Sequence, residues 1–284
     1  MRKASALTRF VASGIAVAAL LSGCGQTPQA SPGSSVPSPV QAAAAGAYQA
    51  RGGDPIGLPA GSLYRNPASG RDEVVVPDMR HTALLIGDSQ SEPTDGWPRL
   101  GLAGVGYKVH FCGLGGTGFV ASNGKTGNYV DALLRGDWKL PYGTPALIVI
   151  QGGGNDAARG ATDAQIVANA DRLIGALKDR YPDARMAMIG TLARGANYGG
   201  GRRTQVDALL GTVAARHGIA FVGVGDWLSK YNLAKNLADA VHMDAAGRRS
   251  LGGLLESRLR QLGLEGPALD GTVPATASAL TPAG

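Results

Sequence analysis

The chain has 284 residues, of which 44 are glycine, and its formal net charge is +6. Glycine therefore makes up about 15 per cent of the chain, against ~7 per cent in ordinary proteins. The sequence has no G-X-Y repeat and 44 per cent of its residues are hydrophobic, which excludes collagen and a wholly disordered chain. Its length accommodates one domain of about 200 residues with terminal appendages.

Part of the positive charge belongs to the N-terminus. Arg2, Lys3 and Arg9 precede an apolar run over residues 10–21, and this pattern is typical of a signal peptide. Without these three residues, 24 basic residues face 21 acidic ones, which leaves a net charge of +3. Nucleic-acid-binding domains cluster their cations on one face. The scattered remainder predicts a solvated surface and no nucleic-acid partner.

The apolar run ends in Leu21-Ser22-Gly23-Cys24, which resembles the lipobox of bacterial lipoproteins. The resemblance implies cleavage before Cys24 and attachment of lipid to its sulfur and new amino group. A run of this length is too short to span ~30 Å of hydrocarbon, so lasting attachment requires acyl chains. We expect an exported protein held on the extracytoplasmic face of the membrane by this anchor alone. The alternative is an ordinary secreted protein with a coincidental cysteine.

Composition divides the chain into four segments. Residues 1–23 form the predicted signal peptide, and residues 24–50, rich in Ala, Pro, Ser, Gly and Gln, predict a flexible tether. Residues 51–265 form the globular domain, and residues 266–284 a disordered tail. Cys112 is the only other cysteine, so acylation of Cys24 excludes an intramolecular disulfide. We expect Cys112 to be a small core residue, because no obvious base lies near it.

Short apolar segments alternate with amphipathic ones in the globular part. Strands are predicted at residues 82–86, 107–111, 146–150, 186–189 and 219–224, and helices at 163–181, 202–217 and 245–262. Thr162 and Gln165 predict a capping box, and Asp244 predicts the cap of the last helix. This alternation predicts an α/β domain with three layers around a parallel sheet of five strands.

Ligands of such sheets bind beyond the carboxyl ends of the strands. Gly87-Asp88-Ser89 follows the first predicted strand, a glycine-rich segment from Gly113 to Gly118 follows the second, and Gly153-Gly154-Asn155-Asp156 follows the third. Asp239-Ala240-Val241-His242 follows the last strand. We expect these four segments to meet at one edge of the sheet.

Their side chains suit hydrolysis by a serine nucleophile. A serine hydroxyl needs a base within hydrogen-bond reach, and His242 is the histidine that lies in a loop just before a helix. Asp239, three residues upstream, can orient the imidazole. Negative charge on the former carbonyl oxygen requires preorganised donors. The candidates are the backbone N–H groups of Ser89 and Gly116 and the side-chain amide of Asn155, with Gly115 as the alternative to Gly116.

In this order and spacing, the four segments resemble the SGNH (GDSL-type) hydrolase family over residues 82–262. Ser89 matches the family's nucleophile, Gly116 and Asn155 its oxyanion donors, and Asp239 and His242 its terminal Asp-x-x-His. The resemblance implies a flavodoxin-like α/β/α fold and a carboxylic ester hydrolase without metal or other cofactor. The sequence departs from the GDSL label at Gln90, where leucine is expected.

Other interpretations remain at this stage. We expect acetyl or short-chain acyl esters of carbohydrates or cell-envelope components as substrates, and a monomer; the alternatives are hydrolysis of lipid esters and a carbohydrate-binding protein without turnover. Arg159 either orients the substrate or pairs with Asp156. Four aromatic residues could stack on sugars at the edge or could be ordinary loop packing: Trp97, Tyr129, Trp138 and Tyr142. The glycine-rich segment satisfies G-x-G-x-x-G, but no helix pattern follows it, which disfavours dinucleotide binding.

Overall fold

The fold is described by a computed structural model that covers residues 50–51 and 57–267. The predicted signal peptide, Cys24 and nearly all of the predicted tether and tail lie outside the described residues. Within the described residues, no helix is both long and apolar enough to cross a membrane.

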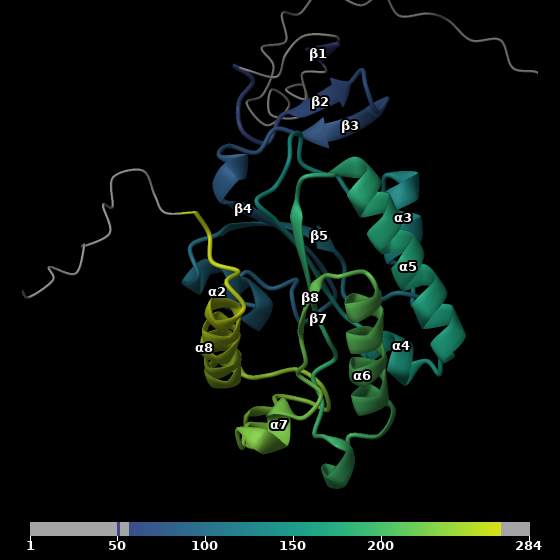
Figure 1. Cartoon of the computed structure of the whole chain (residues 1–284), viewed down its shortest axis with the longest axis vertical. Coiled ribbons are helices and arrows are strands. Elements are labelled where there is room, and N and C mark those ends of the chain that lie inside the picture. The colour runs from purple at the N-terminus through teal and green to yellow at the C-terminus, as the bar shows by residue number, and fades with distance from the viewer. Residues whose placement is uncertain (1–49, 52–56, 268–284) are drawn as a thin grey trace, which may run out of the picture. The chain divides into compact units, whose positions relative to one another are not determined.

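Five parallel strands form the main sheet in the order β5-β4-β6-β7-β8 (Figure 1). They are β4 (Thr82–Gly87), β5 (Lys108–Gly113), β6 (Leu147–Gln151), β7 (Arg185–Ile189) and β8 (Ala220–Val222). Every residue of β4 and β6 is buried. Burial on both faces explains why their sequences are continuous apolar runs rather than alternating ones.

Helices cover both faces of this sheet, as Figure 1 shows. On one face lie α2 (Trp97–Gly104) and α8 (Ala245–Gln261), and on the other α3 (Tyr129–Arg135), α5 (Asp163–Arg180) and α6 (Gly201–Arg216). Shorter elements lie in the loops: α4 (Gly154–Ala158), α7 (Trp227–Lys230), and the 3-10 turns η1 (Met79–His81), η2 (Ala196–Tyr198) and η3 (Ala234–Asn236). The predicted three-layer α/β/α class with a five-stranded parallel sheet is confirmed.

The predicted helix caps are present. The Thr162 hydroxyl accepts a hydrogen bond from the Gln165 backbone N–H, and the Gln165 side chain in turn accepts from the Thr162 N–H. At the last helix, the Asp244 carboxylate accepts from the Gly247 N–H at 2.6 Å. Each cap satisfies backbone donors that have no partner inside the helix.

A second, small sheet has no counterpart among the predicted elements. It contains β1 (Ala50–Arg51), β2 (Leu63–Asn66) and β3 (Arg71–Val74). The β2 and β3 strands form an antiparallel hairpin, and Val74 bridges to Pro141 in the segment that leads into β6. The hairpin therefore lies at the amino end of the parallel strands.

Glycine allows α2 and α8 to approach each other closely. A Cβ added to Gly101 of α2 would lie 2.6 Å from side-chain carbons of Leu255, and one added to Gly252 of α8 would lie 2.7 Å from the Leu100 Cβ. Both distances are far below van der Waals contact, so only glycine fits. Part of the glycine excess thus serves helix packing rather than loops.

Candidate active site

The proposed nucleophile lies in the turn that follows β4. The strand ends at Gly87, and the N–H groups of Ser91 and Glu92 donate to the Asp88 carbonyl, which closes the turn. A Cβ at Gly87 would lie 2.6 Å from the Ser91 hydroxyl oxygen, so the turn requires glycine there. This tight turn presents the partly exposed Ser89 at the carboxyl end of the sheet.

Ser89, His242 and Asp239 form a continuous chain of hydrogen bonds. The Nε2 of His242 lies 2.8 Å from the Ser89 Oγ, and its Nδ1 lies 2.8 Å from the Oδ2 of Asp239. The other carboxylate oxygen of Asp239 accepts from the backbone N–H groups of His242 at 2.7 Å and Val241 at 2.8 Å. This is the geometry in which an imidazole can take a proton from a serine hydroxyl.

The backbone N–H of His242, then that of Val241 and the His242 side chain, hold the pKa of Asp239 well below its usual range. Asp239 is exposed, so these hydrogen bonds rather than burial favour its ionised form. An ionised carboxylate at Nδ1 favours the tautomer whose Nε2 faces the serine as an acceptor.

Gln90 joins the serine turn to the histidine loop. Its side-chain Nε2 donates to the Val241 carbonyl at 2.8 Å, and its Oε1 accepts from the indole N–H of Trp97 at 3.1 Å. Leucine, the residue of the GDSL label, could make neither bond. The departure from the family label therefore has a physical role, which no local sequence signal could have predicted.

The candidate oxyanion donors lie around Ser89. Within the described residues, the backbone N–H groups of Ser89 and Gly116 have no protein acceptor, whereas the Gly115 N–H donates to the Glu92 carboxylate at 2.7 Å. Gly116 has a φ of +78°, which favours glycine. The Asn155 Nδ2 donates to the Thr117 carbonyl at 2.9 Å, which ties α4 to the glycine-rich segment. These contacts favour Gly116 over Gly115 as a donor.

Asp156 and Arg159 do not form the ion pair that was one of two predicted alternatives. The buried Asp156 carboxylate accepts from three successive backbone N–H groups, those of Phe119, Val120 and Ala121. Arg159 instead donates to the carbonyl of Ser122 and is exposed. Asp156 thus holds the loop after the glycine-rich segment, and the pairing prediction is wrong because backbone donors already satisfy the carboxylate.

Of the two alternatives for Trp97, Tyr129, Trp138 and Tyr142, sugar stacking and loop packing, the structure agrees with packing. Trp97 and Tyr129 are 0 per cent exposed and Trp138 is 7 per cent exposed, so none presents a face to solvent. Tyr142 packs edge-on against Tyr64 next to the hairpin, with ring centroids 5.0 Å apart. These four side chains therefore serve packing inside the protein. Among the described aromatic residues, Tyr198 is the most exposed, and it follows β7 at the carboxyl edge.

The other histidines and the described cysteine have different surroundings. His81 contacts Asp78, His110 contacts the Lys139 carbonyl, and His217 contacts Asp171. Cys112 is buried, and burial raises the pKa of its thiol to about 12, which agrees with the predicted core role. No group of three or more His, Cys, Asp or Glu that could hold a metal ion is present among the described residues.

Asp88 is buried beside the nucleophile, and burial raises its pKa to about 6 from 3.8. Between pH 3.8 and about pH 6, Asp88 stays protonated in the folded protein, whereas in the unfolded chain it has lost its proton. The contribution of Asp88 to the free energy of unfolding therefore falls as the pH rises and is lost above about pH 6. Relative to the wild type, we expect Asp88→Asn to gain about 2 kcal/mol in free energy of unfolding between pH 4 and pH 7.5. Urea unfolding at both pH values measures this gain, with Asp183→Asn on an exposed turn as the control. A difference that is the same at both pH values would contradict it.

Comparisons with known structures agree with the α/β/α class. An active-site mutant of a family two carbohydrate esterase from Clostridium thermocellum superposes with a TM-score of 0.50 at 15% identity, over 68% of each chain. A family two carbohydrate esterase from Cellvibrio japonicus gives a TM-score of 0.51 at 15% identity, over 68% of this chain and 64% of the other. A mutant acetyl-xylooligosaccharide esterase from Geobacillus stearmophilus gives 0.50 at 18% identity, over 65% and 95%. These likenesses show a shared α/β/α fold.

A comparison with protein families is more specific. The chain belongs to the GDSL-like Lipase/Acylhydrolase family, which matches residues 85–249 and therefore includes all four segments of the candidate site. It is accordingly a hydrolase that cleaves esters. A comparison with curated protein sequences gave no match.

Proposed function

We propose that this hydrolase cleaves esters through Ser89, His242 and Asp239. The observation that carries the proposal is the chain of two 2.8 Å contacts from Ser89 through His242 to Asp239. The Ser89 Oγ forms a bond to the ester carbonyl carbon while His242 Nε2 takes the hydroxyl proton. As the tetrahedral intermediate collapses, the bond to the alcohol breaks and His242 returns the proton to it.

The acyl-enzyme is then hydrolysed by water, with His242 again as the base. In both steps the carbonyl oxygen gains negative charge, which needs donors held in place before the reaction. We assign this role to the N–H groups of Ser89 and Gly116 and to the Asn155 amide. The unpaired state of both backbone donors in the described structure supports the assignment.

For the substrate, we propose acetyl or short-chain acyl esters of carbohydrates. The similar structures named above include two family two carbohydrate esterases and an acetyl-xylooligosaccharide esterase, which supports this class. Tyr198, which is 69 per cent exposed at the same edge of the sheet, offers an aromatic face to a sugar ring.

Chain-length preference tests the substrate proposal. We expect kcat/KM for p-nitrophenyl acetate to exceed that for p-nitrophenyl octanoate by about tenfold or more, since a site shaped for a short acyl group excludes extra methylenes. Acetate release from acetylated xylo-oligosaccharides should accompany it. Preference for octanoate would contradict the acetylesterase proposal and favour lipid esters.

We also propose export, cleavage before Cys24 and lipid attachment there, with residues 24–50 as a tether, residues 51–265 as the catalytic domain and residues 266–284 as a tail. The proposal rests on the charged N-terminus, the short apolar run and the lipobox-like segment. Incorporation of a labelled fatty acid into the wild-type chain but not into the Cys24→Ser chain tests it, and equal labelling of both would overturn it.

A further inference from the structure

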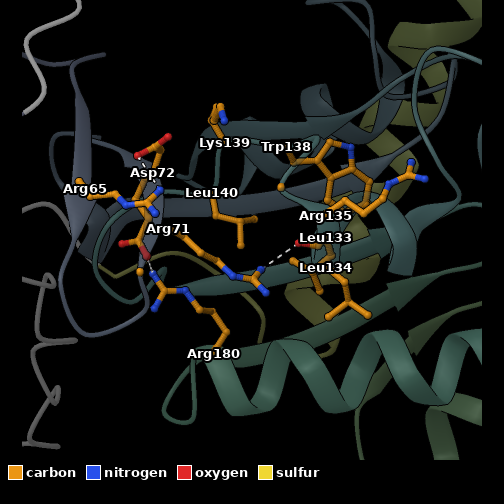
Figure 2. Close-up of a pocket in the computed structure, with 13 residues that line it drawn as sticks. Arg65, Arg71, Asp72, Leu133, Leu134, Arg135, Trp138, Lys139, Leu140 and Arg180 are labelled. Carbon is orange, nitrogen blue, oxygen red and sulfur yellow. Dashed lines mark hydrogen bonds and ion pairs between the residues drawn. The ribbon is translucent and has the colours of Figure 1, made fainter.

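A pocket rich in cationic side chains lies away from the candidate active site (Figure 2). It is formed by the β2–β3 hairpin, the end of α3, the segment after α3 and the last residue of α5, and its volume is about 220 Å³. Its charged lining residues are Arg65, Arg71, Asp72, Glu73, Arg135, Lys139 and Arg180. We call it the arginine pocket.

The arginine pocket and the candidate active site lie at opposite ends of the parallel sheet. The hairpin joins the segment before β6 through the bridge of Val74 with Pro141, at the amino end of the strands. Ser89 follows the carboxyl end of β4. In Figure 1 the hairpin accordingly lies at one end of the domain, and α4 and α7, which follow β6 and β8, lie at the other. The pocket is therefore separate from the hydrolytic site.

Cations exceed carboxylates among the lining residues by five to two. Two of the cations have partners inside the pocket, because Arg65 contacts Asp72 at 3.2 Å and Arg180 contacts the buried Glu73. Arg135 pairs with a carboxylate that is not part of the lining, that of Asp137, at 2.7 Å.

Arg71 and Lys139 have no carboxylate partner within the described part of the chain. Arg71 extends from β3 across the pocket, as Figure 2 shows, and donates to the Leu133 carbonyl at 2.9 Å. That bond orients the guanidinium but does not neutralise it. The residues that line the pocket therefore carry a net positive charge.

Two buried donors in the pocket walls also lack acceptors. Among the described residues, the Nε1 of Trp138 and the Nε of Arg180 are buried and have no hydrogen-bond partner. Both atoms are covered by the protein itself, so a group bound in the pocket would not reach them. The uncompensated cations are therefore the feature that calls for a ligand, and the ligand they call for is an oxyanion.

Apolar side chains adjoin the charged ones. A neighbouring cavity of about 420 Å³ shares Arg71 and Arg180 with the arginine pocket and is also lined by Leu133, Leu134, Leu140 and Ala176. Leu134 is 45 per cent exposed, so its side chain is accessible to a ligand. A ligand held by Arg71 could therefore place an apolar part against these leucines.

We propose that the arginine pocket binds the phosphate group of an organic phosphate. Guanidinium groups present paired N–H donors that match phosphate oxygens, and a phosphate dianion suits several convergent cations better than a single carboxylate does. The phosphate is carried either by a small polar molecule or by an amphiphile such as a lipid, and both sources share this recognition chemistry.

Calorimetric titration with inorganic phosphate at constant ionic strength tests the proposal on the full chain. We expect Arg71→Gln to weaken binding by about tenfold or more, because a charge-assisted hydrogen bond is lost. Arg249→Gln, which removes the same charge from an exposed position on α8, should change the affinity less than twofold. Absence of phosphate binding, or equal affinity in the wild type and Arg71→Gln, would overturn the proposal.

Lys139→Gln is a second variant that still tests the proposal if Arg71→Gln fails to fold. The Lys139 side chain is exposed and only its backbone carbonyl makes contacts, so this variant should fold normally and still weaken phosphate binding severalfold. Esterase activity should stay unchanged in both variants, which separates this proposal from the hydrolytic one. If neither variant weakens binding, the phosphate lies elsewhere and the proposal is wrong.

Two further titrants distinguish the sources of the phosphate. Hexyl phosphate should bind about tenfold or more tightly than glycerol phosphate if the leucines accept an apolar tail, and Leu134→Gln should remove that difference. Such a result supports the proposal with a lipid-like phosphate as the ligand. Equal binding of the two supports it with a small polar phosphate.

Discussion

Replacing Ser89 by alanine is expected to lower kcat for p-nitrophenyl acetate by about 10⁴-fold or more. The hydroxyl that lies 2.8 Å from His242 Nε2 is the only candidate nucleophile in this arrangement, and alanine leaves the imidazole with nothing to deprotonate. Since the change is small and the residue is only partly buried, the variant should keep the wild-type unfolding temperature. Initial-rate kinetics and thermal unfolding of the same preparation measure both effects.

Ser122→Ala is the matched control for this substitution. Ser122 is exposed near the same edge, and only its backbone carbonyl is used, by Arg159. The control should retain wild-type kcat. If Ser89→Ala hydrolyses the ester as fast as the wild type does, the acyl-enzyme mechanism is wrong and the fold serves another site.

The second large effect is expected at His242. His242→Ala should lower kcat by about 10⁴-fold, because a serine hydroxyl with no base attached is a poor nucleophile. Because the Ser89 hydroxyl would remain, the loss in kcat would measure how far His242 activates that hydroxyl. Steady-state kinetics at pH 7.5 measure the loss, and added imidazole should restore part of the rate by entering the space that the side chain leaves.

His217 provides the control because it forms a similar pair elsewhere in the fold. Its Nε2 lies 2.7 Å from the Asp171 carboxylate, but among the residues that the structure describes no serine completes the chain. His217→Ala should therefore leave kcat within twofold of the wild-type value. Equal losses in the two histidine variants would mean that His242 acts through stability, and would contradict its role as the base.

The sequence was sufficient to predict the features that follow from periodicity and strand ends. Buried parallel strands are continuous apolar runs, long helices repeat at 3.6 residues, and loops at the carboxyl ends of strands converge. From these rules came the five strands, the caps at Thr162 and Asp244, and the expectation that Ser89 and His242 would meet. The contacts of Ser89 with His242, 153 residues away, agree with that expectation.

Other features depend on contacts that no local pattern encodes. The α2 helix is short and contains Gly101, which weakens any helical signal, and its formation depends on close packing against α8. Trp97 falls in a loop-like sequence, yet it is buried and donates to Gln90. The arginine pocket combines residues from the hairpin and from α5 whose side chains meet through tertiary packing alone, such as Glu73 with Arg180.

The distance in sequence between Ser89 and His242 also has a consequence for synthesis of the chain. The nucleophile lies near the start of the domain and its base near the end, and Gln90 anchors to the histidine loop across 151 residues. Under the proposed mechanism, a chain that has been synthesised only in part lacks a working site, however well its first strands have formed. Esterase activity would then report that the whole domain has been made and folded, and any truncation before His242 should be inactive in such an assay.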